Sequence, residues 1–168
     1  VVSFHTEGSE LLIRAGDEPS RFAHHPEVVI VEVTAEGESA RRAAALGIGT
    51  ADLPALLLSQ NGKLRVAALR VTPEEVTTLT AGDGVAAERI LVYGAGWCPD
   101  CRNAKRILGD ADLSYDEVDI DGDAAAEREV VLRSGGRRVI PTLAFDGRVW
   151  AFNPSAPWLR RLVSKIGR

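Results

Sequence analysis

Residues 90–101 are Ile-Leu-Val-Tyr-Gly-Ala-Gly-Trp-Cys-Pro-Asp-Cys, an apolar run that ends in small residues and then in a closely spaced pair of cysteines. The run Ile90–Tyr93 is short and apolar throughout, which is typical of a buried strand. Gly94 to Gly96 predict a loop, and Arg102–Leu108 carries apolar residues at helical spacing. The stretch therefore predicts a strand, a loop and a helix, with the cysteine pair where the helix begins.

The rest of this half extends the pattern to the order β-α-β-α-β-β-α. The further strands are predicted at 115–120, 142–145 and 148–152. The further helices are predicted at 124–133 and from Ser155 onward. Asp146-Gly147 is a favoured turn pair for the hairpin that joins the last two strands.

The N-terminal half repeats this order less distinctly. The predicted strands are 1–4, 28–33, 55–58 and 64–69, and the predicted helices begin in 10–14, at Ser39 and at Thr72. Laid over the second half, Phe4 falls on Tyr93, Ser9 on Cys98, Leu12 on Cys101 and Pro54 on Pro141. We therefore predict an α/β protein of two tandem domains, 1–80 and 89–168, joined by a linker at 81–88.

Composition excludes several classes of protein. The chain has 168 residues, of which 45% are hydrophobic and 26% charged, as in an ordinary globular protein. A net charge of −4 argues against a generally basic nucleic-acid binder. No apolar stretch approaches the ~18 residues that a membrane span needs, and no signal peptide is recognisable at the start. We expect a cytoplasmic protein with neither nucleic acid nor membrane as its partner.

The chemistry is carried by Cys98 and Cys101, the only cysteines of the chain. A helix N-terminus lowers the pKa of a thiol and so favours the reactive thiolate of Cys98. Cys101, one turn later, could then attack a mixed disulfide on Cys98 and release the product. The alternatives are two inert thiols, or a metal site that would need distant histidines. Those histidines are His5, His24 and His25, and we expect no metal.

Two motifs together make residues 89–168 resemble a glutaredoxin-family domain of the thioredoxin fold. They are Trp97-Cys98-Pro99-Asp100-Cys101 at the first strand–helix junction and Ile140-Pro141-Thr142 before the third strand. The resemblance implies that Cys98 and Cys101 are catalytic and that the peptide bond before Pro141 is cis. It also implies a substrate-binding surface formed by Trp97, Pro99, Ile140, Pro141 and Thr142. By the overlay, the N-terminal half resembles a thioredoxin-like domain without cysteines, so that each domain would have a central mixed sheet flanked by helices.

The stretch Phe152-Asn153-Pro154-Ser155 is similar to the mycoredoxin branch of that family. It replaces the Gly-Gly element that helps to hold glutathione, and Gly94-Ala95-Gly96 stands where the family commonly has a lysine. Both departures argue against glutathione as the preferred partner. The resemblance implies no bound cofactor, but a low-molecular-weight thiol of the glutathione, mycothiol or bacillithiol type as co-substrate.

The predicted function is that of a thiol–disulfide oxidoreductase acting on disulfides of proteins or of small thiols. An upstream thiol or flavoprotein reductase would regenerate it. The alternative is an electron-relay or adaptor module in which the N-terminal half docks to a dedicated flavoprotein reductase or peroxiredoxin. Four arginines near the second motif suit carboxylates of a ligand or partner, or simply form a solvated surface. They are Arg133, Arg137, Arg138 and Arg148.

Overall fold

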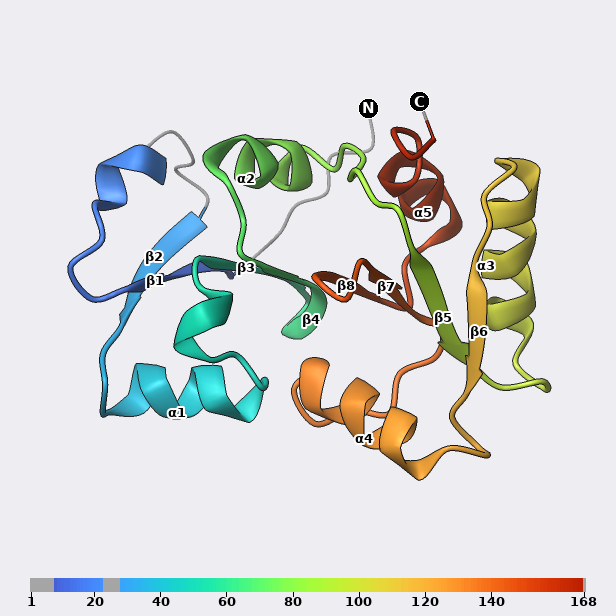
Figure 1. Cartoon of the computed structure of the whole chain (residues 1–168), viewed down its shortest axis with the longest axis horizontal. Coiled ribbons are helices and arrows are strands. Elements are labelled where there is room, and N and C mark those ends of the chain that lie inside the picture. The colour runs from blue at the N-terminus through green and yellow to red at the C-terminus, as the bar shows by residue number, and fades with distance from the viewer. Residues whose placement is uncertain (1–7, 23–27, 168) are drawn as a thin grey trace.

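The computed structural model describes residues 8–22 and 28–167, which form an α/β fold around one eight-stranded mixed sheet (Figure 1). The strands are β1 Ser9–Arg14, β2 Val28–Val33, β3 Ala55–Gln60, β4 Lys63–Leu69, β5 Ile90–Gly94, β6 Asp116–Asp119, β7 Thr142–Phe145 and β8 Val149–Phe152. The α-helices are α1 Glu38–Ala45, α2 Pro73–Thr80, α3 Pro99–Asp110, α4 Ala124–Arg133 and α5 Ala156–Leu162. Two 3-10 helices, η1 Pro19–Phe22 and η2 Thr50–Asp52, complete the described elements.

Local signals account for the elements of the C-terminal half, all of which the sequence predicts. Asp123 caps α4, since its carboxylate accepts hydrogen bonds from the amides of Ala125 and Ala126 at 2.9 and 3.0 Å. Asp146 and Gly147 take φ of 54° and 63°, the left-handed geometry of a tight hairpin turn between β7 and β8. The resulting strand order β6-β5-β7-β8 and the alternating helices are thioredoxin-like.

Most of the N-terminal half is also as predicted. Helix α1, strand β2, the β3–β4 hairpin and α2 lie where the sequence places them. Thr72 and Glu75 form a reciprocal capping box at the start of α2, with Thr72 Oγ1 accepting the Glu75 amide at 3.2 Å.

The prediction of a helix beginning in 10–14 is wrong, because these residues form strand β1. Leu11, Leu12 and Ile13 are all buried, and the strand lies between β2 and β3. A strand covered on both faces has no alternation of apolar and polar residues, so its pattern does not distinguish it from a short helix. The strand predicted at 1–4 lies outside the described residues.

The overlay of the two halves is corrected at its beginning. Strand β1 pairs in parallel with β2 and antiparallel with β3, as β5 does with β6 and β7. Leu12 faces Ala55 as Tyr93 faces Thr142, so β1 and not residues 1–4 is the counterpart of β5. Ser9 and Leu12 therefore do not occupy the places of Cys98 and Cys101. After β1 the described residues up to Phe22 form the short η1 where the other half has α3.

The two halves share one sheet where the sequence predicts one for each half. The strand order is β2-β1-β3-β4-β8-β7-β5-β6. When β1 to β4 are matched in turn with β5 to β8, this order is symmetric about the β4–β8 pair. Ala67 lies opposite Trp150, flanked by the pairs Val66–Ala151 and Ala68–Val149. We call this junction of strands β4 and β8 the seam.

Two apolar layers run across the seam. One face of the sheet packs against η1, α2, α3 and α5, and the other packs against α1 and α4, which lie on the same side of the sheet in Figure 1. The connection between the halves is itself packed, because Val85 is buried and its amide donates to the Leu162 carbonyl at 2.9 Å.

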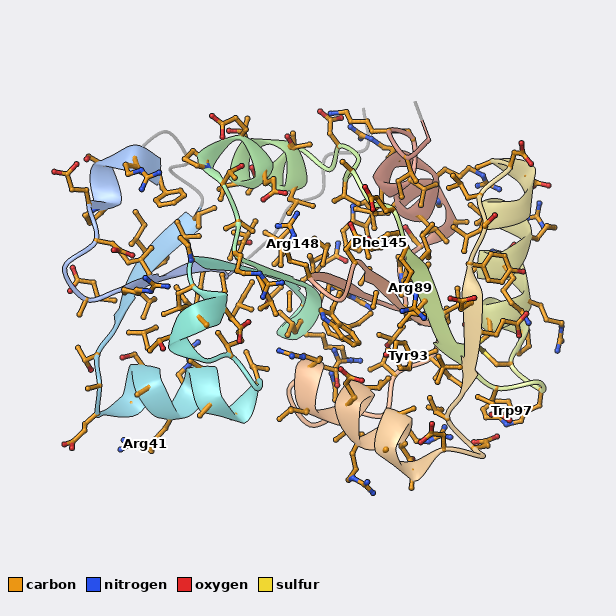
Figure 2. The ribbon with its side chains drawn as sticks, in the orientation of Figure 1. Arg41, Arg89, Tyr93, Trp97, Phe145 and Arg148 are labelled. Carbon is orange, nitrogen blue, oxygen red and sulfur yellow. A yellow bond between two sulfur atoms is a disulfide. The ribbon has the colours of Figure 1, made fainter. Side chains whose placement is uncertain are left out.

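Arg148 directly precedes β8, and its side chain forms hydrogen bonds with residues of the N-terminal half (Figure 2). Its Nη1 donates to the Leu69 carbonyl at 3.1 Å and to Glu75 Oε2 at 3.0 Å, and its Nη2 pairs with Glu75 Oε1. Burial alone would raise the pKa of Glu75, but hydrogen bonds from Arg148 and the Thr72 amide, with the charge of Arg148, lower that pKa overall.

We predict that Arg148→Ala lowers the free energy of unfolding by about 1–3 kcal/mol at neutral pH, because half-buried hydrogen bonds to Leu69 and Glu75 are lost. Because the folded pKa of Glu75 is depressed, this stabilisation is complete above the usual pKa of about 4.3 and is lost as the pH falls through the folded value. Urea unfolding of wild type and variant over a pH series measures both effects.

Arg89→Ala is the matched control, since Arg89 and Asp116 form an ion pair with side chains 69% and 64% exposed. Exposed pairs contribute about 0–1 kcal/mol. Equal losses in the two variants would contradict a role for Arg148 at the seam.

Candidate active site

Cys98 and Cys101 form a disulfide at the N-terminus of α3, with their Cα atoms 5.2 Å apart. Cys98 is the N-cap residue, and its Sγ accepts a hydrogen bond from the Cys101 amide at 3.1 Å. In the reduced protein the same amide and the positive end of the helix dipole favour a thiolate on Cys98. The structure thus places both cysteines as the sequence predicts.

The sulfur atoms are largely covered. Cys98 is 4% exposed and Cys101 2%, and they pack with Ala95 and against the partly buried Ile140. Pro99 is in the first turn of α3, where its missing amide hydrogen costs no helix hydrogen bond. The helix start and the Ile140 segment, far apart in sequence, therefore meet at the disulfide.

A pocket of about 220 Å³ lies on the Cys101 side of the disulfide, between β5, β6 and α3. Its ionisable lining residues are Lys105, Glu117 and Asp119. Lys105 Nζ lies 2.9 Å from Glu117 Oε2. A space of this size can hold water, and it brings the buried Cys101 into one pocket with three ionisable side chains.

Trp97 projects from the loop before α3 and is 63% exposed (Figure 2). Its Nε1 donates to Asp121 Oδ2 at 2.7 Å, and Arg102 reaches back to the Gly96 carbonyl at 3.2 Å. These contacts hold an apolar surface beside the disulfide. From the sequence, residues 121–123 are predicted only as a turn. The contact between Asp121 and Trp97 joins residues 24 apart in sequence, and no local pattern predicts it.

The Ile140–Pro141 peptide bond is cis, as the resemblance implies, and so is Leu53–Pro54. The Pro141 carbonyl accepts the Asn153 amide at 2.8 Å, which ties this segment to the end of β8. Thr142 is fully buried and its Oγ1 donates to the Val139 carbonyl at 2.8 Å. The hydroxyl of Thr142 is therefore engaged inside the protein, and in this segment it is Ile140 that packs against the cysteines.

The four arginines near the second motif do not form one surface. Arg138 pairs with Asp121 and with Glu127, on the side of Trp97. Arg133 and Arg137 donate instead to backbone carbonyls of the N-terminal half, as Arg148 does. The prediction that the four surround a ligand or form a solvated loop thus misses the contacts of three of them, Arg133, Arg137 and Arg148, which cross the seam.

Tyr93 lies one residue before Gly94, on the opposite side of β5 from α3. Burial, together with the charge of Glu129 at 3.3 Å from its hydroxyl, raises the pKa of Tyr93 to about 12. Tyr93 is therefore a neutral hydrogen-bond donor at physiological pH. Its ring packs against Trp150 with centroids 5.5 Å apart, so it supports the strand rather than the sulfur chemistry.

Within residues 8–22 and 28–167, no three His, Cys, Asp or Glu side chains are grouped so as to hold a metal ion. His5, His24 and His25 lie outside these ranges. Each helix in the same ranges is too short or too polar to cross a bilayer.

Comparison with known proteins places this site in a family. Residues 90–150 match the glutaredoxin family model. Mycoredoxin 1 of Corynebacterium glutamicum is 33% identical over 77 residues, which are 46% of this chain and 91% of that protein. Glutaredoxin 3 of Escherichia coli is 37% identical over 57 residues, 34% of this chain and 68% of that protein. Among solved structures, the thioredoxin-like protein BC3987 is 35% identical, with 39% of this chain and 89% of that chain covered and a TM-score of 0.34. Through its C-terminal half and the Cys98–Cys101 pair, the chain belongs to the glutaredoxin family.

Proposed function

We propose that this protein is a thiol–disulfide oxidoreductase that reduces disulfides of proteins, or mixed disulfides of a protein with a small thiol. The observation that carries the proposal is the position of Cys98 at the N-cap of α3, where its Sγ already accepts an amide hydrogen. A group that stabilises negative charge on sulfur favours the thiolate both as nucleophile and as leaving group. The disulfide in the structure is then the oxidised state of the cycle.

In the first step, the Cys98 thiolate attacks one sulfur of the substrate disulfide. A mixed disulfide forms on Cys98, and the other half of the substrate leaves as a thiolate. Cys101 then attacks Cys98 Sγ, which closes the Cys98–Cys101 bond and releases the second thiolate. Two electrons have passed from the protein to the substrate, and a thiol or a flavoprotein reductase must return them.

Cys101 must lose a proton before it attacks. Cys101 is only 2% exposed, but it lines the pocket that also contains Lys105, Glu117 and Asp119. In this proposal the proton leaves through the pocket to water or to a carboxylate.

We propose that Trp97, Pro99, Ile140, Pro141 and Thr142 form the substrate groove. Trp97 supplies an exposed apolar wall, and Ile140 packs against the cysteines. Thr142 acts by fixing the backbone, because its hydroxyl is bonded to Val139. A low-molecular-weight thiol as co-substrate and a reducing, cytoplasmic compartment fit a chain whose only cysteines form this pair.

We predict that Cys98→Ser abolishes reduction of insulin and of a low-molecular-weight mixed disulfide, because the attacking thiolate is gone. Cys101→Ser retains the first step and accumulates a mixed disulfide on Cys98, which mass spectrometry of the intact protein detects. If fully reduced wild-type protein reduces neither substrate, the proposed function is wrong.

Strand β5 passes close to Cys101 at Gly94, and this close packing can be tested separately from the thiol chemistry. A Cβ atom at Gly94 would lie 3.0 Å from Cys101 Sγ and 3.3 Å from Cys101 Cβ. Such contacts force a buried neighbour to shift, at a typical cost of about 1–3 kcal/mol. We predict that Gly94→Ala lowers the stability of the oxidised protein by about this amount in urea unfolding and slows closure of the disulfide.

Gly96→Ala is the matched control, because nothing lies within 4 Å of a Cβ there. It should change neither stability nor rate by more than a small fraction of the Gly94 effect. A Gly94→Ala protein as stable as Gly96→Ala would show that Cys101 does not pack tightly on β5.

For the N-terminal half we propose a supporting role within a pair of thioredoxin-like units, residues 1–80 and 89–168, joined by 81–88. The palindromic strand order supports this duplication. Residues 1–84 contain no cysteine, and after β1 the Arg14 amide donates to Asp17 Oδ2 at 3.2 Å in a closed turn. Arg14 Nε also donates to the Thr50 carbonyl at 3.0 Å. Partner docking by this half remains the alternative role.

We predict that a fragment of residues 81–168 is less stable than the full chain and associates, because removal of β4 exposes the edge of β8 and the contacts of Trp150. Its rate with a small mixed disulfide should stay within about twofold of the full chain, since α3 and the Ile140 segment are intact. Thermal unfolding, sedimentation and the reduction assay measure these properties. A fragment as stable as the full chain would exclude the supporting role, and a selective loss of protein-disulfide reduction would favour docking.

A further inference from the structure

Three half-buried arginines lie near the seam, on the side of the sheet that carries α1 and α4. Arg137 Nη2 donates to the Leu64 carbonyl at 2.8 Å. Arg133 Nη1 donates to the Gly47 carbonyl at 3.1 Å, and its guanidinium lies 5.6 Å from the centre of the Trp150 ring. Arg65, on β4, is the third, so the set draws on both halves of the chain.

Arg65 owes its position to a β-bulge. The β3–β4 register passes from the pair Leu58–Val66 to the pair Ser59–Leu64, which leaves Arg65 as the extra residue of β4. A bulge re-aims the side chain at that point. Here it brings Arg65 close enough to Arg137 for the two positive charges to repel, and burial together with this repulsion lowers the pKa of Arg137.

None of these cations forms an ion pair with another described residue. Nine ion pairs form in that part of the chain, and none includes Arg65, Arg133 or Arg137. Carboxylates are not scarce, since the chain has 24 acidic against 20 basic residues. The Nε atoms of Arg65 and Arg133 are buried and have no hydrogen-bond acceptor. Unsatisfied buried donors of this kind are rare and often mark a missing ion or water.

We propose that Arg65, Arg133 and Arg137 form a binding site for a phosphate group at the seam. Guanidinium groups offer paired N–H donors that match the oxygens of an oxyanion. A dianion would also offset the charges of Arg65 and Arg137, which a neutral ligand or a water molecule would not do. The phosphate group could belong to inorganic phosphate or to a phosphorylated metabolite. Because both halves supply arginines, the bound ion would hold the halves together.

This site is separate from the disulfide and does not depend on the proposed redox function. It also differs from the Arg138 position near Trp97, whose charge is already balanced by Asp121 and Glu127.

The test is binding of inorganic phosphate to the full-length protein, with sodium chloride at matched ionic strength as reference. We expect phosphate to raise the Tm of the wild type in a saturable manner and to change Trp fluorescence, since Trp150 lies beside Arg133. Arg65→Gln and Arg137→Gln should each weaken phosphate binding at least tenfold in calorimetric titration. Arg41→Gln is the control, because Arg41 is exposed on α1, at the outer end of the molecule in Figure 2, and should bind as the wild type does.

Stability without phosphate separates loss of the site from misfolding. Removing one of two facing cations relieves repulsion, so Arg65→Gln should be at least as stable as the wild type in phosphate-free buffer. Arg65→Lys keeps the charge without the fork of donors and should bind phosphate more weakly than the wild type. A parallel titration with glycerol phosphate shows whether an esterified phosphate is also accepted, and binding in either arm supports the site. A phosphate effect no larger than that of chloride, or equal in wild type and Arg65→Gln, would overturn the proposal.

Discussion

The antiparallel pairing of β4 with β8 fixes how the two halves of this protein lie relative to each other. Ala67 faces Trp150 at the centre of the pair, so a small side chain on one strand leaves room for a large one on the other. Because a shift of one residue would turn every side chain of a strand to the opposite face, this register is held by the apolar layers on both sides. It also decides which carbonyls of the N-terminal half the arginines of the other half can reach.

The redox pair is organised more locally than the seam. Strand β5, the loop after it and the first turn of α3 set the positions of Cys98 and Cys101, and one long-range contact, that of Ile140, completes the site. Strands β7 and β8 lie between β5 and the N-terminal half. The N-terminal half therefore has no strand paired with β5, and its direct contribution to the sheet of the other half is to cover the edge of β8.

The redox pair depends mainly on contacts between residues close in sequence, whereas the seam depends on contacts between distant ones. This difference explains which features the sequence could predict. The hairpin turns, the capped helices and the strand–loop–helix around Cys98 depend on residues close in sequence, and they were predicted. Strand β1 was not, because burial of Leu11, Leu12 and Ile13 on both faces removes the alternation that identifies a strand. The partners of Arg133, Arg137 and Arg148 were missed for another reason. They depend on the register between halves some 80 residues apart, for which the sequence contains no local signal.

The corrected overlay also adds a second difference between the halves, besides the absence of cysteine from the N-terminal half. With β1 as the counterpart of β5, the cysteine-bearing turn corresponds to the residues just after Arg14, and the four-residue η1 stands where the other half has the twelve-residue α3. The unpaired amides and the dipole of a helix N-terminus favour a reactive thiolate, and the four-residue η1 offers less of both than the twelve-residue α3. Among residues 15–22, the described part of this connection, the N-terminal half thus has neither a cysteine nor a helix longer than η1. In its place Asp17, an acceptor, closes the turn on the Arg14 amide, so a negative charge already occupies the position where a thiolate would have to form.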